Sequence, residues 1–164
     1  MGLIPNWPSV PSIEEELLKH LERIRALEAL VFQVDAQFDI KVTADNTFFI
    51  LGDGKFIFMI PEDLDAWFLQ GVAGYVTTVG STSTVVTFQN LTTAFTLLYI
   101  ADPLTIDASE FTSYTSASPP VVNVTTDQNQ VFAGDLISVN VDSAGAGAKG
   151  LGVVLDFAED QIGS

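Results

Sequence analysis

Apolar residues recur at helical spacing in one stretch of the chain, residues 12–37. They are separated there by alternating steps of four and three positions, which is the heptad pattern of a coiled coil. Ser12 and Glu15 form an S-x-x-E capping box at the start, and the stretch contains neither Gly nor Pro. We therefore predict an amphipathic helix over residues 12–37. The positions that would line the interface of an oligomer are Leu17, His20, Ile24, Leu27, Val31 and Val34.

Two interpretations of this helix remain open. Leu18, Leu21 and Leu30 widen the apolar stripe beyond a narrow two-stranded seam. A wide stripe fits a three-stranded coiled coil, which would make the protein a homotrimer, and it also fits a helix packed on its own β domain. His20 is the only histidine of the chain. In a trimer, three copies of it could meet at the axis and bind an ion or sense pH, or the position simply tolerates a polar residue.

The first eleven residues, MGLIPNWPSVP, contain three prolines, which favour an extended arm over a helix. Exposed apolar side chains on such an arm need a surface to cover them. We expect the arm to dock on a partner protein or to fold back on its own oligomer. A basic region followed by an apolar block is missing, so we do not expect a secretory signal peptide. The predicted attachment residues are Leu3, Ile4, Trp7 and Val10.

From residue 38 onward the pattern changes to short apolar runs separated by Gly, Pro, Asp and Asn. The runs predict roughly eight short strands with no helix between them, hence an antiparallel β-sandwich or jelly roll over residues 38–164. Residues 48–51 and 55–60 flank Gly52-Asp53-Gly54 and predict a hairpin. Gly71 and Gly74 predict bulges or a strand break. Several strands are apolar on both faces, so we expect one face in the core and the other in a subunit interface.

Composition narrows the classes of function. The 164 residues, 48% of them hydrophobic, fit one domain with a core plus an extension. The sequence contains no run of about eighteen apolar residues, so we expect no membrane-spanning helix. The absence of cysteine excludes disulfides and thiol catalysis. The net charge of −15, without a basic stripe, disfavours binding to nucleic acid or to an anionic membrane. Such a charge suits a protein displayed at high density, because it keeps the surface soluble.

Motifs for catalysis or cofactor binding are weak. A single histidine excludes a histidine-based triad or zinc site within one chain. A calcium site on the loop of Asp102 and Asp107 was considered, but their spacing matches no EF-hand. We therefore predict no catalytic, cofactor-binding or metal-binding residue. The acidic groups weighed for glycosidase chemistry, without any sign of a cleft between them, are Glu62/Asp63/Asp65, Asp102/Asp107/Glu110 and Glu159/Asp160.

Three further motifs have simple alternative explanations. Residues 144–152, AGAGAKGLG, look like a phosphate loop, but Gly150 and a predicted strand follow Lys149, so we expect a flexible hairpin loop. Asn90 and Asn123 each begin an N-x-T glycosylation pattern, which is common by chance. Five aromatic residues could form a sugar-binding platform or pack in the core and interface: Trp67, Tyr75, Tyr99, Phe111 and Tyr114.

The C-terminal half carries a resemblance to a known group of proteins. The segments LTIDASEFTSYT (104–115), PPV (119–121), GDLISVNVD (134–142) and GAGAKGLGVVLDF (145–157), in this order, resemble small virion structural proteins of tailed bacteriophages. The match extends more loosely to residues 49–61 and covers about two thirds of the chain, without the N-terminal arm and helix. The resemblance implies a non-enzymatic, jelly-roll-like and trimeric β domain on the outside of a virion.

These expectations combine into one functional hypothesis and its alternatives. The chain would be a trimeric capsid decoration (cement) protein on the outer surface of the phage head. Its arm and helix would attach it to the major capsid protein or another virion protein. The alternative is a head or tail fibre or tip component that binds a host surface receptor. A carbohydrate-active enzyme or lectin-like module is disfavoured, because the single histidine and the missing paired-acid motif make hydrolysis improbable.

Overall fold

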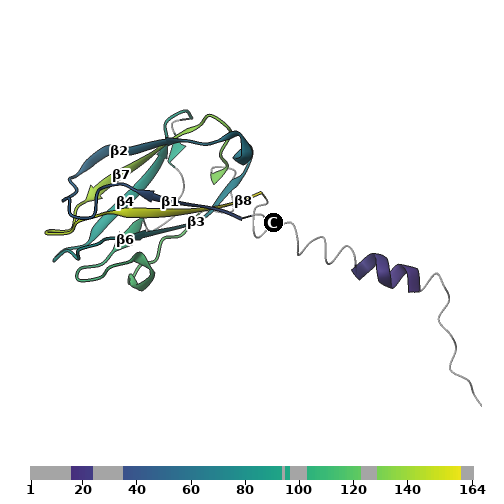
Figure 1. Ribbon diagram of the computed structural model, residues 1–164, viewed down its shortest axis with the longest axis horizontal. Helices are drawn as coiled ribbons and strands as arrows, with labels where there is room; N and C mark the ends of the chain where they lie inside the picture. The colour runs from purple at the N-terminus through teal and green to yellow at the C-terminus, as the bar shows by residue number, and fades with distance from the viewer. Residues whose placement is uncertain (1–15, 24–34, 94, 97–102, 123–128, 160–164) are drawn as a thin grey trace, which may run out of the picture. The chain divides into compact units, whose positions relative to one another are not determined.

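The computed structural model describes residues 16–23, 35–93, 95–96, 103–122 and 129–159 (Figure 1). The chain divides into two compact units, Met1–Val34 and Asp35–Ser164. In the first unit the described residues 16–23 form a helix, which agrees with the sequence pattern. The rest of the predicted seam and the whole predicted arm lie outside the described residues: Ile24, Leu27, Val31 and Val34, and Leu3, Ile4, Trp7 and Val10.

The second unit is mainly β, with antiparallel strands arranged in two sheets, as the sequence predicts. One sheet has the order β1-β8-β3; the other has the order β2-β7-β4-β5, with β6 also pairing with β4 (Figure 1). Two 3-10 turns, η1 (Glu62–Leu64) and η2 (Ser113–Thr115), interrupt the connections. The described strands are β1 (Asp35–Lys41), β2 (Gly52–Met59), β3 (Phe68–Tyr75), β4 (Thr84–Asn90), β5 (Phe95–Thr96), β6 (Leu104–Ile106), β7 (Leu136–Ser143) and β8 (Gly152–Ala158).

The core lies between the two sheets. Every second residue of β8 points into it, and Val153, Leu155 and Phe157 are fully buried, as their alternation predicts. From the other sheet, Ile137 and Val139 of β7 are equally buried and belong to the same apolar cluster. Burying one such side chain contributes about 1.5–3 kcal/mol. A single core shared by two antiparallel sheets is a sandwich-like arrangement.

The β unit begins three residues earlier than expected. Asp35 pairs with Ala158, so residues 35–37 belong to β1 and not to the predicted helix, whose limit at residue 37 is wrong. The side-chain amide of Gln37 donates a hydrogen bond to Asp156 Oδ1 (2.8 Å) across the strands. The helical spacing of the preceding residues could not reveal this pairing, because the partner strand is more than one hundred residues away.

The predicted hairpin of residues 48–51 and 55–60 is wrong. β2 pairs with β7, where Phe56 lies opposite Val139, and residues 48–51 belong to the connection that precedes β2. Gly52 and Gly54 have φ angles of 136° and 62°, values that favour glycine. They form an irregular start of β2, where the register shifts before Phe56. The Gly-Asp-Gly motif therefore marks a bulged strand start and not a two-residue turn.

The predicted hairpin loop at residues 144–152 is also wrong, because the chain crosses here from one sheet to the other. β7 lies in the five-stranded sheet and β8 in the three-stranded sheet. The connection is held on both sides: Ser81 N–H donates to the Ala146 carbonyl (2.9 Å), and Gly150 N–H donates to the Thr47 carbonyl (3.1 Å). A strand follows it, as predicted, so the phosphate-loop geometry of a helix N-terminus does not arise.

The two glycines of β3 have different roles. The register with β8 shifts between Leu69 and Gly71, which confirms a bulge at that point. Gly74 is paired regularly, but a Cβ placed there would lie 2.7 Å from Leu104 Cδ2. Its N–H also donates to the buried Ser113 Oγ (2.9 Å). Gly74 is therefore required for close packing of β3 against β6 and η2, not for a bulge.

A buried polar pair holds one end of the five-stranded sheet. The side-chain amide of Asn90 donates to Asp135 Oδ2 (2.8 Å), and both residues are almost fully buried. Asn90 Oδ1 accepts the N–H of Thr92 (3.0 Å), and Asp135 Oδ2 also accepts the N–H of Phe132 (3.0 Å). These bonds join the end of β4 to the turn before β7.

Replacing Asn90 by Ala should destabilise the fold, because the buried carboxylate of Asp135 loses its side-chain donor. We expect a loss of about 1–3 kcal/mol in the free energy of unfolding, measured by guanidinium denaturation. Asn46→Ala, at an exposed turn position, is the control and should stay within about 0.5 kcal/mol of wild type. Equal midpoints for Asn90→Ala and wild type would contradict this role.

Candidate functional site

The described helix of the first unit has an apolar and a charged side. At about 100° per residue, its leucines share one side, and the charged residues of the same two turns occupy the other. In the single chain Leu17, Leu18 and Leu21 are 61%, 62% and 49% exposed. Together these three side chains form an exposed apolar stripe on the described helix, which we call the leucine stripe.

His20 lies beside the leucine stripe. Its Nδ1 is 3.0 Å from the carbonyl oxygen of Glu16, so with a proton on Nδ1 the ring donates to the preceding turn. A shallow hollow there is lined by His20 itself and by neighbouring side chains of this helix, among them Lys19 and Arg23. Of the predicted seam, Leu17 and His20 thus lie on the described helix, on adjoining parts of its surface.

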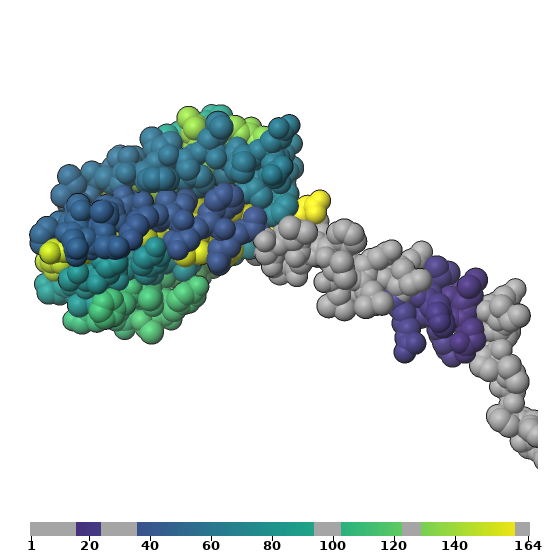
Figure 2. Space-filling view, in the orientation of Figure 1, coloured from purple at the N-terminus to yellow at the C-terminus, as the bar shows by residue number. Residues whose placement is uncertain are grey.

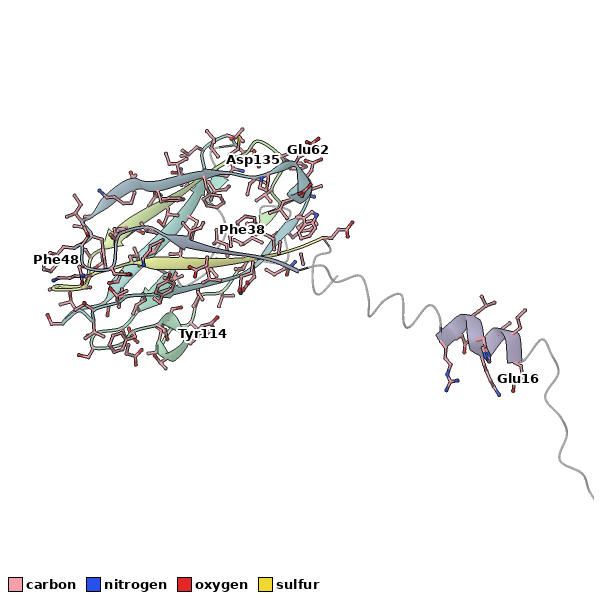
Figure 3. The ribbon with its side chains drawn as sticks, in the orientation of Figure 1. Glu16, Phe38, Phe48, Glu62, Tyr114 and Asp135 are labelled. Carbon is pink, nitrogen blue, oxygen red and sulfur yellow. The ribbon has the colours of Figure 1, made fainter. Side chains whose placement is uncertain are left out.

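Three exposed apolar residues gather at one end of the β unit, which we call the loop end and which comprises residues 42–51, 76–83 and 144–151. Phe48, Ile50 and Leu51 are 60%, 69% and 59% exposed, whereas Phe49 between them is buried. Figure 3 shows Phe48 at the end of the unit opposite Glu62. The buried Phe49 anchors the segment, so its exposed neighbours form a fixed apolar tip.

All three basic residues of the stretch from 35 to 164 lie at or near the loop end. Lys149 Nζ lies 4.4 Å from the centroid of the Phe48 ring, a cation–π contact. The ammonium of Lys41 pairs with the carboxylate of Asp45, and this hydrogen bond raises the pKa of Lys41. Lys55 Nζ reaches back toward Gly52, next to the apolar tip. At the left of Figure 2, yellow atoms of the β7–β8 connection lie beside blue atoms of this end.

The opposite end, which we call the acidic end, comprises residues 60–67, 91–93 and 129–135. Glu62, Asp63 and Asp65 are exposed there, and these three segments contain no basic residue. Asp65 Oδ1 accepts the N–H of Ala133 (3.0 Å), which ties two of the segments together. Figure 3 shows Glu62 and Asp135 at this end.

An exposed apolar patch lies on the outer face of the five-stranded sheet beside the acidic end. Met59 of β2 pairs directly with Leu136 of β7, and Leu91 N–H donates to the Leu136 carbonyl (2.8 Å). Ile57 lies two residues before Met59, on the same face. Met59 is 63% exposed and the other three are at least two-fifths exposed. We call Ile57, Met59, Leu91 and Leu136 the sheet-face patch.

The carboxylates considered for chemistry or calcium have structural partners. Asp107 Oδ2 accepts the N–H of Ala117 (2.8 Å), and Glu110 accepts the hydroxyl of Thr115 (2.5 Å), so both hold the loop around η2. Asp102 and Asp160 lie outside the described residues. Among the residues that the structure does describe, no group of three or more histidines and carboxylates is placed to hold a metal ion.

The glycosylation pattern at Asn90 is not an accessible acceptor in the folded chain. Its side chain is 2% exposed, and its amide nitrogen is hydrogen-bonded to Asp135. Attachment of a glycan would require this bond to break. Asn123, in the second pattern, lies outside the described residues.

The five aromatic residues considered for a sugar platform do not form one surface. Trp67 precedes β3, whereas Tyr75 ends it, so they lie at opposite ends of the strand. The Tyr75 hydroxyl donates to Asp39 Oδ1 (3.0 Å), and partial burial, together with this bond, raises the pKa of Tyr75. Phe111 lies just before η2 and Tyr114 lies within it, and both are exposed; Tyr99 lies outside the described residues.

The apolar tip is the feature that the sequence pattern missed. FFIL at 48–51 was expected to form a strand that pairs with 55–60, whereas the structure exposes three of its four side chains. The signal available was the glycine pair that follows, because Gly52 and Gly54 stop this segment from continuing directly into a regular strand.

In the described part of the chain, no helix is both long enough and apolar enough to cross a membrane. Comparison with protein-family models, with curated proteins and with solved structures found no match to this chain. The features that bear on function are therefore those of the chain itself, the leucine stripe and the two ends of the β unit.

The leucine stripe should support self-association. Leu17→Ser together with Leu21→Ser removes apolar surface from the leucine stripe, and we expect the mass in dilute solution, measured by sedimentation equilibrium, to fall toward that of one chain. Lys19→Ser together with Glu22→Ser, on the charged side of the same turns, is the matched control and should leave the mass unchanged. An unaltered mass for the leucine variant would show that this stripe is not an association surface.

Proposed function

We propose that this chain is a non-enzymatic virion structural protein of a tailed bacteriophage, a trimeric capsid decoration (cement) protein. Its β domain is a jelly-roll-like sandwich that faces outward from the surface of the head. The arm of residues 1–11 and the helix that follows attach it to the major capsid protein or to another virion protein. The proposal includes no catalytic residue, cofactor or metal.

The observation that carries this proposal is that the described core lies within the second unit, whereas the described helix of the first unit has exposed leucines. The described apolar core, from Ile40 to Phe157, belongs entirely to the second unit. The helix of the first unit exposes its leucine stripe. A domain with its own core leaves such a helix free for association, since amphipathic helices are stabilised mainly by burying their apolar side.

The segments that carry the phage resemblance are structural elements of the β domain. Residues 104–115 comprise β6 and η2, residues 134–142 lie largely in β7, and residues 145–157 form the β7–β8 connection and most of β8. β7 and β8 each lie between neighbours in their own sheets. The resemblance therefore involves the framework of both sheets, which favours a shared architecture rather than a shared active site.

Trimer formation would strengthen attachment by multivalency. A single arm with Leu3, Ile4, Trp7 and Val10 offers only a small apolar contact. Once one arm of a trimer is bound, the other two are held near their own sites at a high effective concentration. Three weak contacts can thus hold one trimer durably on neighbouring capsid subunits.

Deleting residues 1–11 should abolish binding to undecorated capsids while leaving a folded oligomer, because the attachment residues lie before the helix. Binding is measured by cosedimentation with capsids, and folding by circular dichroism and mass. A full-length variant with Leu3, Ile4, Trp7 and Val10 replaced by Ser separates the role of apolar contact from that of length. Normal decoration by the truncated chain would refute attachment through the arm.

The exposed aromatic pair beside η2 favours a second candidate function. Tyr114 is 78% exposed and Phe111 is 58% exposed, on a loop held by Glu110 and Asp107. Aromatic faces on an ordered loop can stack on sugars or contact a receptor protein. The chain would then be a head or tail fibre or tip component that binds a host surface receptor.

This alternative predicts that labelled protein binds host cells or a glycan array, and that Phe111→Ala with Tyr114→Ala removes most of the signal. Val121→Ala, at another exposed apolar position, is the control. Labelling of intact particles gives an independent test: label only on the head, with no binding to cells, would exclude the receptor function and favour decoration.

A further inference from the structure

We propose that the β domains of neighbouring copies associate head to tail: the apolar tip at the loop end of one copy docks on the sheet-face patch of the next. The occupant of the patch is thus a second copy of this chain. The inference builds on the trimer of the proposed function, but it concerns a contact that the helix and arm do not make.

Symmetry gives the first reason. Three copies around a threefold axis meet through two different surfaces of each copy, which must be complementary to each other. A pair of copies around a twofold axis would instead need one self-complementary patch. The β unit offers two different exposed apolar surfaces, Phe48 with Ile50 and Leu51 at one end and the sheet-face patch near the other.

Charge gives the second reason. Lys41, Lys55 and Lys149 lie at or near the loop end together with carboxylates, namely Asp45, which pairs with Lys41, Asp39, which accepts from Tyr75, and the exposed Asp53 and Asp142. The acidic end carries Glu62, Asp63 and Asp65 without a basic residue in its segments. Contact between unlike ends brings Lys55 and Lys149 toward carboxylates, whereas contact between two acidic ends is repulsive.

The edge of the sheet gives the third reason. β2 is an edge strand of the five-stranded sheet, and edge strands are usually protected by bulges or by charged side chains. The first half of β2 has both, with the irregular Gly52 start and Lys55. The second half, from Ile57 to Met59, has neither and presents two exposed apolar side chains. The exposed apolar side chains of this half of β2 therefore need another protein surface to cover them.

The tip is suited to such docking because it is held in place. Phe49 is buried in the core, Gly150 N–H donates to the Thr47 carbonyl, and Lys149 covers the Phe48 ring. Exposed side chains on an anchored segment lose little conformational freedom when they bind. The tip can therefore pack on the side chains of Met59 and Leu136 without a preceding rearrangement of its loop.

The native chain has no cysteine, so single introduced cysteines report this contact directly. Ile50→Cys places a thiol on the tip, and Met59→Cys places one on the sheet-face patch. We expect the full chain with both changes to give covalent dimers and trimers with a short bismaleimide crosslinker. Each single variant should give none, because tip does not meet tip and patch does not meet patch. Ile50→Cys combined with Tyr114→Cys, an even more exposed position, is the control and should not crosslink.

Charge reversal tests the pairing of the two ends in the same double-cysteine chain. Lys55→Glu with Lys149→Glu should lower the crosslinked yield severalfold. Adding Glu62→Lys and Asp63→Lys should restore it, since the attraction is then rebuilt with opposite signs. A general effect of charge on folding would not be rescued in this way.

Several results would overturn the head-to-tail contact, and each has a distinct meaning. Trimers by mass that do not crosslink would leave the trimer standing and exclude this contact. Crosslinks in either single variant would indicate a symmetric face-to-face contact instead. Crosslinks formed only to a capsid protein on particles would assign the patch to that partner. Monomers by mass would overturn both this contact and the trimer of the proposed function, whereas loss of capsid binding alone would not affect it.

Discussion

The β unit depends on the connection between β7 and β8, which carries the chain from one sheet to the other. Its backbone is fitted closely: a Cβ at Gly145 would lie 2.7 Å from the Thr82 carbonyl oxygen, and Gly150 has a φ of 65°. Through Ala146 and Lys149 it bonds to the β3–β4 connection, and through Gly150 to the loop that carries Phe48. One crossing therefore positions both central strands and the apolar tip. The same connection that joins the two sheets around the core therefore also fixes where the exposed residues of the loop end lie.

The two units satisfy different physical requirements. The β unit buries the inward-facing apolar side chains of its strands between two sheets. Two apolar surfaces remain exposed, the apolar tip and the sheet-face patch. The described helix has exposed leucines within its own unit, and a coiled coil or the surface of a β domain could cover them. Association through helices would bring several β units close together, and a weak contact between their ends would then act at high local concentration. In the proposed assembly, helix and β unit would complement each other.

The sequence alone predicted the β class, the buried face of β8, the bulge near Gly71 and the helix around Leu17, because each follows from local periodicity or from glycine. Sheet order was not predictable in this way: the glycines at 52 and 54 suggested a hairpin, but β2 pairs with β7, more than seventy residues away. Similarly, the sequence shows only that Asn90 begins a glycosylation pattern, whereas the hydrogen bond to Asp135 in the folded chain accounts for its burial. The sequence shows each lysine, but it does not show that all three lie near the same end of the β unit, because that depends on the sheet topology.

Lysines stand beside carboxylates at the loop end, whereas the acidic end has carboxylates alone, so the charges of the two ends differ and give the β unit a dipole component along its strands. A dipole acts before contact, since its field turns an approaching molecule while it is still separated by water. A copy that diffuses toward another would arrive with its loop end foremost against the acidic end. This preorientation weakens as salt rises, because screening shortens the range of the field to about 10 Å at 0.1 M. In the proposed contact, the arrangement of three lysines would therefore set how quickly copies associate, separately from how tightly they bind.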